Sequence, residues 1–260
     1  MPADPRCSEC DGTGWKQVLR DGVTAVERCG CVQTAPRADR LAKAHIPPRF
    51  GNAGFENFSL PRENPIEREA LSAAMLASKA YVREYPFGPK KGLMFQGPTG
   101  VGKTHLAAAV LHELLAKGFE GLFLEYQKWL AKLRQGYDVL AGPDNRRAYQ
   151  SALETEVLLM DDLGSERRSD WVEDTVTAVI NHRYNTEQAL IVTTNLPLPE
   201  LGDLTSVKNP VSGHYHVKDT LADRVGARAV SRLFEMCHVI RLQTRDYRLK
   251  DLRRTAGTGA

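Results

Sequence analysis

The sequence predicts an α/β protein, in which a five-stranded parallel sheet lies between helices and a small N-terminal metal-binding module precedes it. Three observations lead to this fold class. Five apolar runs alternate with segments of helical character, which favours a parallel sheet that is covered on both faces. A glycine-rich phosphate-binding motif lies between the first run and the next helix. Four of the five cysteines stand in two close pairs near the N-terminus.

These N-terminal cysteines have the spacing of a zinc site, which needs four tetrahedral ligands. Two tight turns would supply the thiolates of Cys7, Cys10, Cys29 and Cys31. Residues 12–27 between the pairs are long enough for a short hairpin that turns at Asp21-Gly22. Because so short a segment buries little apolar surface, zinc is expected to stabilise it as a unit with its own core. Four unrelated reduced thiols are the alternative.

The chain of 260 residues is long enough for one large α/β domain with a small appendage. We assign residues 1–35 to the zinc module, 36–63 to a linker and 64–260 to the main domain. Residues 64–84 have the apolar periodicity of an amphipathic helix. The main domain is therefore expected to begin with that helix.

Composition limits the class of protein. The net charge of +3 is too mild to indicate nucleic-acid binding by itself. No apolar run approaches the ~20 residues of a membrane-spanning helix, and the first residues lack the apolar core of a signal peptide. These features predict a cytoplasmic protein that has no membrane partner and whose cysteines stay reduced.

The phosphate-binding motif fits the pattern G-x-x-x-x-G-K-[ST] and follows the apolar run 92–96. Its glycines let consecutive N–H groups point at phosphate oxygens, and the helix that follows adds a partial positive charge. Lys103 is expected to reach the β- and γ-phosphates, and the Thr104 hydroxyl to bind Mg²⁺. A chance glycine-rich turn is improbable in this strand–loop–helix context. The residues assigned to nucleotide binding here are Gly97, Pro98, Thr99, Gly100, Val101, Gly102, Lys103, Thr104 and His105.

A basic segment follows the second predicted strand, residues 121–125. It is expected to form a helix over 126–135 and a loop over 136–147. Cations interleaved with aromatic residues suit single-stranded nucleic acid, and a solvated helix face explains them equally well. The cations are Lys128, Lys132, Arg134, Arg146 and Arg147, and the aromatic residues are Tyr126, Trp129 and Tyr137.

Two acids end the third apolar run, residues 157–160. The carboxyl ends of buried parallel strands are where α/β proteins bind ligands, so Asp161 and Asp162 are expected beside the phosphates. Asp161 would bind Mg²⁺, and Asp162 would orient and activate the attacking water. Glu166 is a weaker candidate for that second role. A capping pair before the next helix is the alternative.

The next helix is expected over 171–186, and a buried strand over 189–197 ends near Asn195, which such a strand would place beside the γ-phosphate. A polar insertion, residues 202–217, comes next. Its His214-Tyr215-His216 is interpreted as part of a solvated loop rather than a metal site.

The last predicted helix spans residues 219–236. Arg224, Arg228 and Arg232 recur in it at four-residue spacing, which predicts one arginine stripe on one face. The final strand is expected over 239–242 and follows Cys237, which we interpret as a buried apolar residue.

The motifs GPTGVGKTH, LLMDDLGSE, TTNLP and RAVSRLFEMC occur in this order, which resembles the AAA+ ATPases of the DnaC/IstB type. These are bacterial replicative-helicase loaders and transposition helper ATPases. IPPRF, FENF and Asp246-Tyr247-Arg248 also resemble that family, so the resemblance covers about residues 45–250. It implies that Lys103 and Thr104 are the Walker A pair and that Asp161 and Asp162 are the Walker B pair. It also implies sensor 1 at Asn195 and an arginine finger at Arg232, with Arg228 as the second choice for the finger. No C-terminal lid domain is expected.

The resemblance also implies a function. Such a protein would hydrolyse ATP with Mg²⁺, assemble head to tail with copies of itself, and deliver a hexameric replicative helicase onto single-stranded DNA. The alternative within the family is an IstB-like transposition helper that acts with a transposase on duplex DNA. The zinc module favours the loader. Its first cysteine pair also resembles DnaJ-type co-chaperones, which suggests a scaffold, and the P-loop alone fits a small-molecule kinase, which the arginine stripe disfavours.

Overall fold

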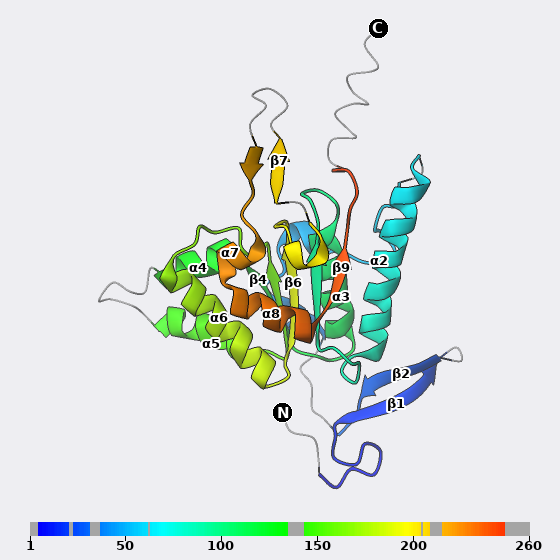
Figure 1. Ribbon diagram of the computed structural model, residues 1–260. Coiled ribbons are helices and arrows are strands. Elements are labelled where there is room, and N and C mark those ends of the chain that lie inside the picture. The colour runs from blue at the N-terminus through cyan, green and yellow to red at the C-terminus, as the bar shows by residue number, and fades with distance from the viewer. Residues whose placement is uncertain are drawn as a thin grey trace.

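The computed structural model describes residues 5–20, 23–31, 37–61, 63–134, 143–203, 205–208 and 215–247. Its centre is a five-stranded sheet with the order β4-β5-β6-β3-β9 (Figure 1). All neighbouring strands are parallel, which confirms the predicted sheet. The strands are β3 (Gly92–Gln96), β4 (Gly121–Glu125), β5 (Val157–Asp161), β6 (Ala189–Thr194) and β9 (Cys237–Arg241).

The register of the strands brings their polar ends to one edge of the sheet. Gln96 at the end of β3 lies opposite Thr194 at the end of β6, and Glu125 of β4 lies opposite Asp161 of β5. All residues of β3 and β6 are buried, because their apolar runs face helices on both sides. The carboxyl edge of the sheet is therefore where polar residues gather.

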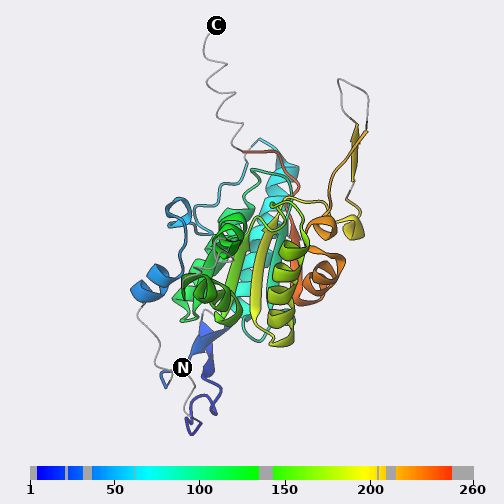
Figure 2. The ribbon, with the colours of Figure 1, turned by 90° about the vertical axis from the view of Figure 1, so that its left-hand side faces the viewer.

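Helices cover both faces of the sheet, as Figures 1 and 2 show. Among the described residues, one apolar core lies between the sheet and the first three helices, and a second lies between the sheet and the other five. On the first face are α1 (Arg37–Lys43), α2 (Pro65–Glu84) and α3 (Lys103–Ala116). On the second are α4 (Tyr126–Arg134), α5 (Pro143–Glu154), α6 (Asp170–Asn185), α7 (Leu221–Val225) and α8 (Ala227–Met236).

Two predicted elements are corrected. The predicted loop 136–147 is wrong at its end, because α5 begins at Pro143, and proline suits the first turn of a helix. The predicted helix 219–236 is two helices, α7 and α8, that meet at Gly226. Gly226 has φ +89°, and a Cβ there would lie 2.6 Å from the Glu173 carboxylate. The arginine stripe is therefore divided, since Arg224 lies on α7 while the other two lie on α8.

The N-terminal module contains the expected hairpin, β1 (Trp15–Arg20) paired antiparallel with β2 (Val23–Arg28). It lies below the sheet in Figure 1, at the end opposite the phosphate-binding loop. The Trp15 ring stacks on Phe119 with 4.1 Å between centroids, and the Arg28 guanidinium lies 4.5 Å above Trp15 and forms an ion pair with Glu156. The expectation of a separate core is therefore wrong, because the hairpin packs against the main domain.

The segment predicted as a linker is packed rather than extended. It contains α1 and the 3₁₀ helix η1 (Pro48–Phe50), and the backbone N–H of Phe123 donates to the carbonyl of Ala44 at 2.7 Å. Side chains of α3 contact two more of its carbonyls: His105 that of Gly54 and His112 that of Phe50, each at 2.9 Å. These contacts attach the segment to α3.

The polar insertion follows a 3₁₀ helix, η2 (Pro199–Leu201), and contains a short hairpin of β7 (Ser206–Lys208) and β8 (Tyr215–Val217). The hairpin projects beyond the carboxyl edge of the sheet (Figure 1). His214 and Tyr137 lie outside the described residues. In the part of the chain that is described, no helix is both long and apolar enough to cross a membrane.

Candidate nucleotide-binding site and zinc site

The phosphate-binding loop joins β3 to α3 at the carboxyl edge of the sheet. Gly100 and Gly102 have φ of +77° and +95°, which other residues rarely adopt, and a Cβ on Gly102 would lie 2.7 Å from the Phe58 ring. The Lys103 side chain is 8% exposed. Its ammonium donates to the carbonyls of Gly97 and Pro98 at 2.8 and 2.7 Å. The phosphate-binding loop therefore curls around the Lys103 ammonium and binds it through its own carbonyl groups.

The two predicted Mg²⁺ ligands are in direct contact. The Thr104 hydroxyl donates to Oδ1 of Asp161 at 2.8 Å, although the residues lie on different elements. Burial raises the pKa of Asp161, while hydrogen bonds from two hydroxyl groups lower it in part. A hydroxyl and a carboxylate side by side are oxygen ligands of the kind that Mg²⁺ prefers. The donor set therefore fits the ion.

Thr193 is a site residue that the sequence reasoning missed. Its hydroxyl donates to the same Oδ1 of Asp161 at 2.7 Å and accepts the backbone N–H of Asp162 at 2.8 Å. Its side chain is 1% exposed, near the end of β6. The signal was present, since a hydroxyl residue two positions before Asn195 lies near the end of the strand that pairs with β5.

The remaining predicted residues differ in their surroundings. Asp162 is exposed and has φ +61°, and Asn195 is exposed just after β6. Glu166 instead forms an ion pair with Arg134 at 3.0 Å. Asp162 therefore fits the role of a water-orienting carboxylate better than Glu166 does.

The phosphate-binding loop is covered by a segment far away in sequence. Tyr247 donates its backbone N–H to the carbonyl of Gly100 at 3.1 Å, and a Cβ on Gly100 would overlap the Asp246 carboxylate. Leu242 donates its backbone N–H to the carbonyl of Gln96 at 2.8 Å. Residues after β9 therefore belong to the wall of the site.

The three predicted arginines are not equivalent. Arg224 forms an ion pair with Asp219 at 2.9 Å and donates to the carbonyl of Glu166. Arg232 donates to the Asn181 side chain and lies 5.6 Å above the Tyr184 ring. Arg228 is exposed and makes no hydrogen bond or ion pair with the described residues. Arg228 and Arg232 remain the candidates for contact with a second subunit.

The four N-terminal cysteines lie together. Their Sγ atoms are within 4.8 Å of one another, with 3.5 Å between Cys7 and Cys29 and between Cys10 and Cys31. Four thiolates bound to one zinc ion at about 2.3 Å lie about 3.8 Å apart, so the cluster fits zinc. Burial raises the pKa of Cys10, but the N–H of Gly14 and the neighbouring thiols lower it to about 7. The backbone N–H of Cys31 lowers the pKa of Cys29, but burial and the neighbouring thiols raise it to about 12. Without metal, the thiolate form is therefore favoured at Cys10 and disfavoured at Cys29.

The interpretation of the basic segment as an aromatic stacking surface is wrong for Tyr126 and Trp129, the two of its three aromatic residues that the structure describes. Tyr126 and Trp129 are 1% and 5% exposed and pack in the core beneath α4. They are three residues apart, so they lie on the inner face of the helix. Bases therefore cannot stack on either of them. Lys128 is exposed at the surface and forms an ion pair with Glu125 at 2.8 Å.

The parallel sheet, the loop that holds Lys103, and the contact between Thr104 and Asp161 define a P-loop nucleotide-binding protein. The chain belongs to the family of IstB-like ATP binding proteins, whose profile matches residues 52–255. The AAA+ fold expected from the resemblance is confirmed.

Similar proteins include a helicase loader, an ATP-binding protein of an insertion sequence and an uncharacterized protein. The replicative helicase loader DnaC of Escherichia coli (strain K12) is 24% identical over 162 residues, which make up 62% of this chain and 63% of that protein. A putative ATP-binding protein of an insertion sequence, Rv3427c of Mycobacterium tuberculosis, is 31% identical over 163 residues, 63% of this chain and 60% of that protein. YqaM of Bacillus subtilis, an uncharacterized protein, is 25% identical over 76% of this chain. The match to YqaM covers 61% of its length, so the chain spans about three fifths of these relatives.

Solved structures agree with the fold. A crystal structure of the DnaC helicase loader has a TM-score of 0.58 and 30% identity, over 75% of this chain and 99% of that chain. A crystal structure of DnaI has a TM-score of 0.57 and 24% identity, over 76% of this chain and 94% of that chain. The second likeness shows the fold alone.

Proposed function

We propose that this protein is an ATPase that loads a replicative helicase onto single-stranded DNA. The observation that carries the proposal is the contact between Thr104 and Asp161 beside the buried Lys103. This is the arrangement that a P-loop protein needs to hold a nucleotide with its metal ion. The helicase is suggested by the likeness to the DnaC helicase loader, at 30% identity over 75% of the chain.

Each site residue has a distinct role in this proposal. Lys103 exchanges the carbonyls of its own loop for phosphate oxygens, and Thr104 and Asp161 hold Mg²⁺. When bound, Mg²⁺ offsets the negative charge of the phosphates. Asp162 orients the attacking water and accepts its proton, and Asn195 contacts the γ-phosphate. These roles use groups that lie at one edge of the sheet.

Assembly would complete the site. An arginine from a second subunit would reach the γ-phosphate, because its guanidinium keeps its charge and matches phosphate oxygens. A head-to-tail contact of this kind produces rings or open spirals. The zinc module lies at the opposite end of the sheet from the P-loop (Figure 1), so it is available to bind the helicase while the P-loop binds nucleotide.

The second candidate function is a transposition helper that acts on duplex DNA with a transposase. It is favoured by the likeness to putative ATP-binding proteins of insertion sequences, which are 28% and 31% identical to this chain. The packed four-cysteine module favours the loader, because it offers a separate surface for a helicase.

The test is to measure ATP turnover alone, with single-stranded DNA and with duplex DNA, and to purify the protein with a hexameric replicative helicase. We expect single-stranded DNA to change turnover more than duplex DNA does, and the helicase to co-purify. Lys103→Ala is the control, because it removes the cation that reaches the phosphates. Stronger stimulation by duplex DNA without helicase binding would favour the transposition helper. Normal ATP affinity in the Lys103→Ala variant would contradict the nucleotide site itself.

A further inference from the structure

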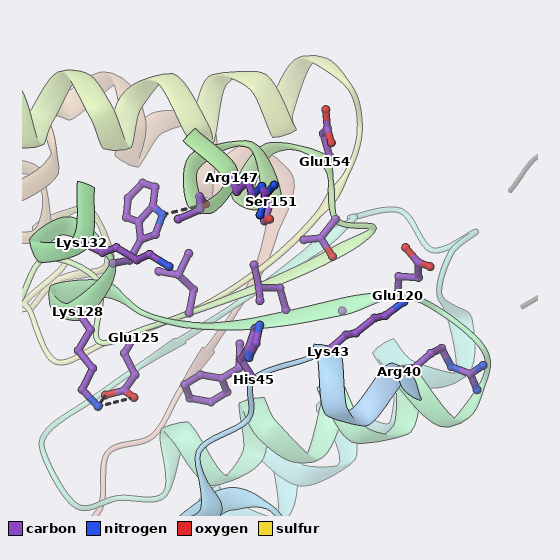
Figure 3. Close-up of a pocket in the computed structure, with 17 residues that line it drawn as sticks. Arg40, Lys43, His45, Glu120, Glu125, Lys128, Lys132, Arg147, Ser151 and Glu154 are labelled. Carbon is purple, nitrogen blue, oxygen red and sulfur yellow. Dashed lines mark hydrogen bonds and ion pairs between the residues drawn. The ribbon is translucent and has the colours of Figure 1, made fainter. Parts of the chain in front are cut away.

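Asp203 bonds the ends of two neighbouring strands at the carboxyl edge of the sheet. Its carboxylate forms an ion pair with Arg241, the last residue of β9, and its Oδ2 accepts a hydrogen bond from the side-chain amide of Gln96 at 2.8 Å. Gln96 ends β3, lies opposite Arg241 in the register of the two strands, and directly precedes the phosphate-binding loop. The three side chains are separate from the groove beside β4, the outermost strand on the other side of the sheet, where Lys128 pairs with Glu125 (Figure 3). Asp203 therefore belongs to the surroundings of the candidate nucleotide site.

Asn195 lies between two contacts with the start of the phosphate-binding loop. The carbonyl of Thr194, the residue before it, accepts the backbone N–H of Gly97 at 3.2 Å. The carbonyl of Leu196, the residue after it, accepts a second hydrogen bond from the Gln96 amide, also at 3.2 Å. The nitrogen of that amide must face both of its partners, because a carbonyl and a carboxylate are acceptors only. The backbone around Asn195 is therefore held beside the loop by Gln96, whose other contact is the Asp203 carboxylate.

Asp203 also fixes the far end of the segment that begins at Asn195. Its Oδ2 accepts the backbone N–H of Leu198 at 2.8 Å, and its partner Arg241 donates to the carbonyl of Leu201 at 2.9 Å. Residues 195–203 are thus bonded to the ends of both β3 and β9. Because these bonds meet at one carboxylate, its loss would release the segment at several points.

The side chains around this carboxylate are largely buried and incompletely bonded. Those of Asp203 and Gln96 are 13% and 6% exposed, so water has little access to replace their contacts. Among the described residues, Oε1 of Gln96 and Nε of Arg241 are buried without a hydrogen-bond partner. Removing the carboxylate would leave more of these atoms unpaired. The position of residues 195–203 is therefore sensitive to Asp203.

We propose that Asp203 is a positioning residue for ATP hydrolysis, whose carboxylate sets where Asn195 stands relative to the γ-phosphate. The inference rests on the proposed function, in which Asn195 contacts the γ-phosphate. Asp203 acts through Gln96 and Leu198, which hold the backbone on the carboxyl side of Asn195. A residue that acts by orientation changes the rate of hydrolysis rather than the affinity for ATP, and a displacement of about 1 Å is enough for a large loss of rate.

The test measures kcat and the Kd for ATP with Mg²⁺ in variants of the full chain. Asp203→Asn keeps the size of the side chain but removes its charge and one acceptor oxygen. We expect kcat to fall about tenfold or more while the Kd stays within about threefold. Gln96→Met keeps the length of its side chain, loses the amide and should give the same result, so it serves in place of Asp203→Asn if that variant does not fold. In the Asn195→Ala background, Asp203→Asn should cause no further loss, because it acts through Asn195.

Asp219→Asn is the matched control, because Asp219 lies in the same connection between β6 and α7 but pairs with Arg224. It should leave kcat within about twofold. Equal losses of kcat in the Asp203→Asn and Asp219→Asn variants would overturn the inference, as would losses that multiply in the double variant with Asn195→Ala.

Two further outcomes separate this inference from the proposals on which it rests. Reduced turnover in Asn195→Ala, with normal turnover in Asp203→Asn and Gln96→Met, would overturn the role of Asp203 alone. Normal turnover in Asn195→Ala would overturn that role together with the proposed role of Asn195. None of these measurements involves DNA or a helicase, so the inference can fail while the loading function stands, and the reverse.

Discussion

Thr193 donates its hydroxyl proton to Asp161 across neighbouring strands, with 2.7 Å between Oγ1 and Oδ1. The same hydroxyl accepts the backbone N–H of Asp162, and the same carboxylate oxygen accepts the Thr104 hydroxyl. One buried side chain on β6 therefore orients both acids of the candidate site. Partners of metal ligands commonly have this role.

The first prediction concerns this hydroxyl. Thr193→Val keeps the shape of the side chain but removes the donor to Asp161, so turnover should fall about tenfold or more and a higher Mg²⁺ concentration should be needed. ATP affinity in the absence of Mg²⁺ should stay unchanged, because no phosphate contact is lost. Thr193→Ser retains the hydroxyl and should recover most of the activity. Mg²⁺ titrations of turnover that coincide for the valine and serine variants would exclude a role of the hydroxyl.

The second prediction concerns the stability cost of Asp161. Burial raises the pKa of this carboxyl, so its charge destabilises the nucleotide-free protein. Asp161→Asn should therefore stabilise the nucleotide-free protein at pH 7.5 and abolish the stabilisation by ATP with Mg²⁺. The raised pKa of Asp161 destabilises the folded protein at a pH above that pKa, and has no effect at a pH below the ordinary pKa of Asp. The stability gained by Asp161→Asn should therefore shrink as the pH falls from the raised pKa toward the ordinary one. Urea unfolding of both proteins at pH 7.5 and pH 4.5 measures the gain in unfolding free energy. A gain that is larger at pH 4.5 than at pH 7.5 would contradict the raised pKa of Asp161.

Much of the fold can be predicted from the sequence, because each buried parallel strand is a continuous apolar run and a helical segment separates it from the next. The run 157–160 ending in Asp161 also predicts where the acids lie. Contacts between elements that are distant in the sequence could not be predicted in this way. The Thr193 hydroxyl is buried against Asp161, and Asp246 lies on Gly100, only because the strands take this order. Likewise the stacking of Trp15 on Phe119 depends on where the hairpin packs.

The third prediction concerns the zinc module. The purified protein should hold one zinc ion per chain, and Cys7→Ser should lose it, whereas Cys237→Ser should keep it because that thiol is fully buried elsewhere. Chelation should loosen the hairpin and expose Trp15, which shifts its fluorescence to longer wavelength. Trp15→Phe should lack this shift. Elemental analysis that finds no zinc in a fully folded protein would rule the site out.

The fourth prediction concerns Arg183, which is fully buried and has carbonyl groups as its hydrogen-bond partners. Burial lowers its pKa to about 10, so it is charged at neutral pH. The carbonyls belong to Ala152, Leu153, Thr155, Glu156 and Ala189. Arg183→Met leaves all of them without this donor and should cost about 3–5 kcal/mol of unfolding free energy. Arg183→Lys should recover only part, since an ammonium has fewer donors. A loss below about 1 kcal/mol in urea unfolding would show that water replaces the guanidinium.

The last prediction separates two roles of Arg232. If it reaches the nucleotide of a neighbouring subunit, Arg232→Ala should keep ATP affinity but lose turnover by about 10³-fold, as loss of an arginine finger does. Mixing this variant with Lys103→Ala should restore part of the turnover, because each supplies the half-site that the other lacks. Arg232 also donates to Asn181 within its own chain, so Asn181→Ala is the matched control. It removes that contact while leaving the guanidinium available, and turnover should persist. Equal losses in the Asn181→Ala and Arg232→Ala variants, without rescue in the mixture, would assign Arg232 a role within its own subunit and leave the exposed Arg228 as the finger.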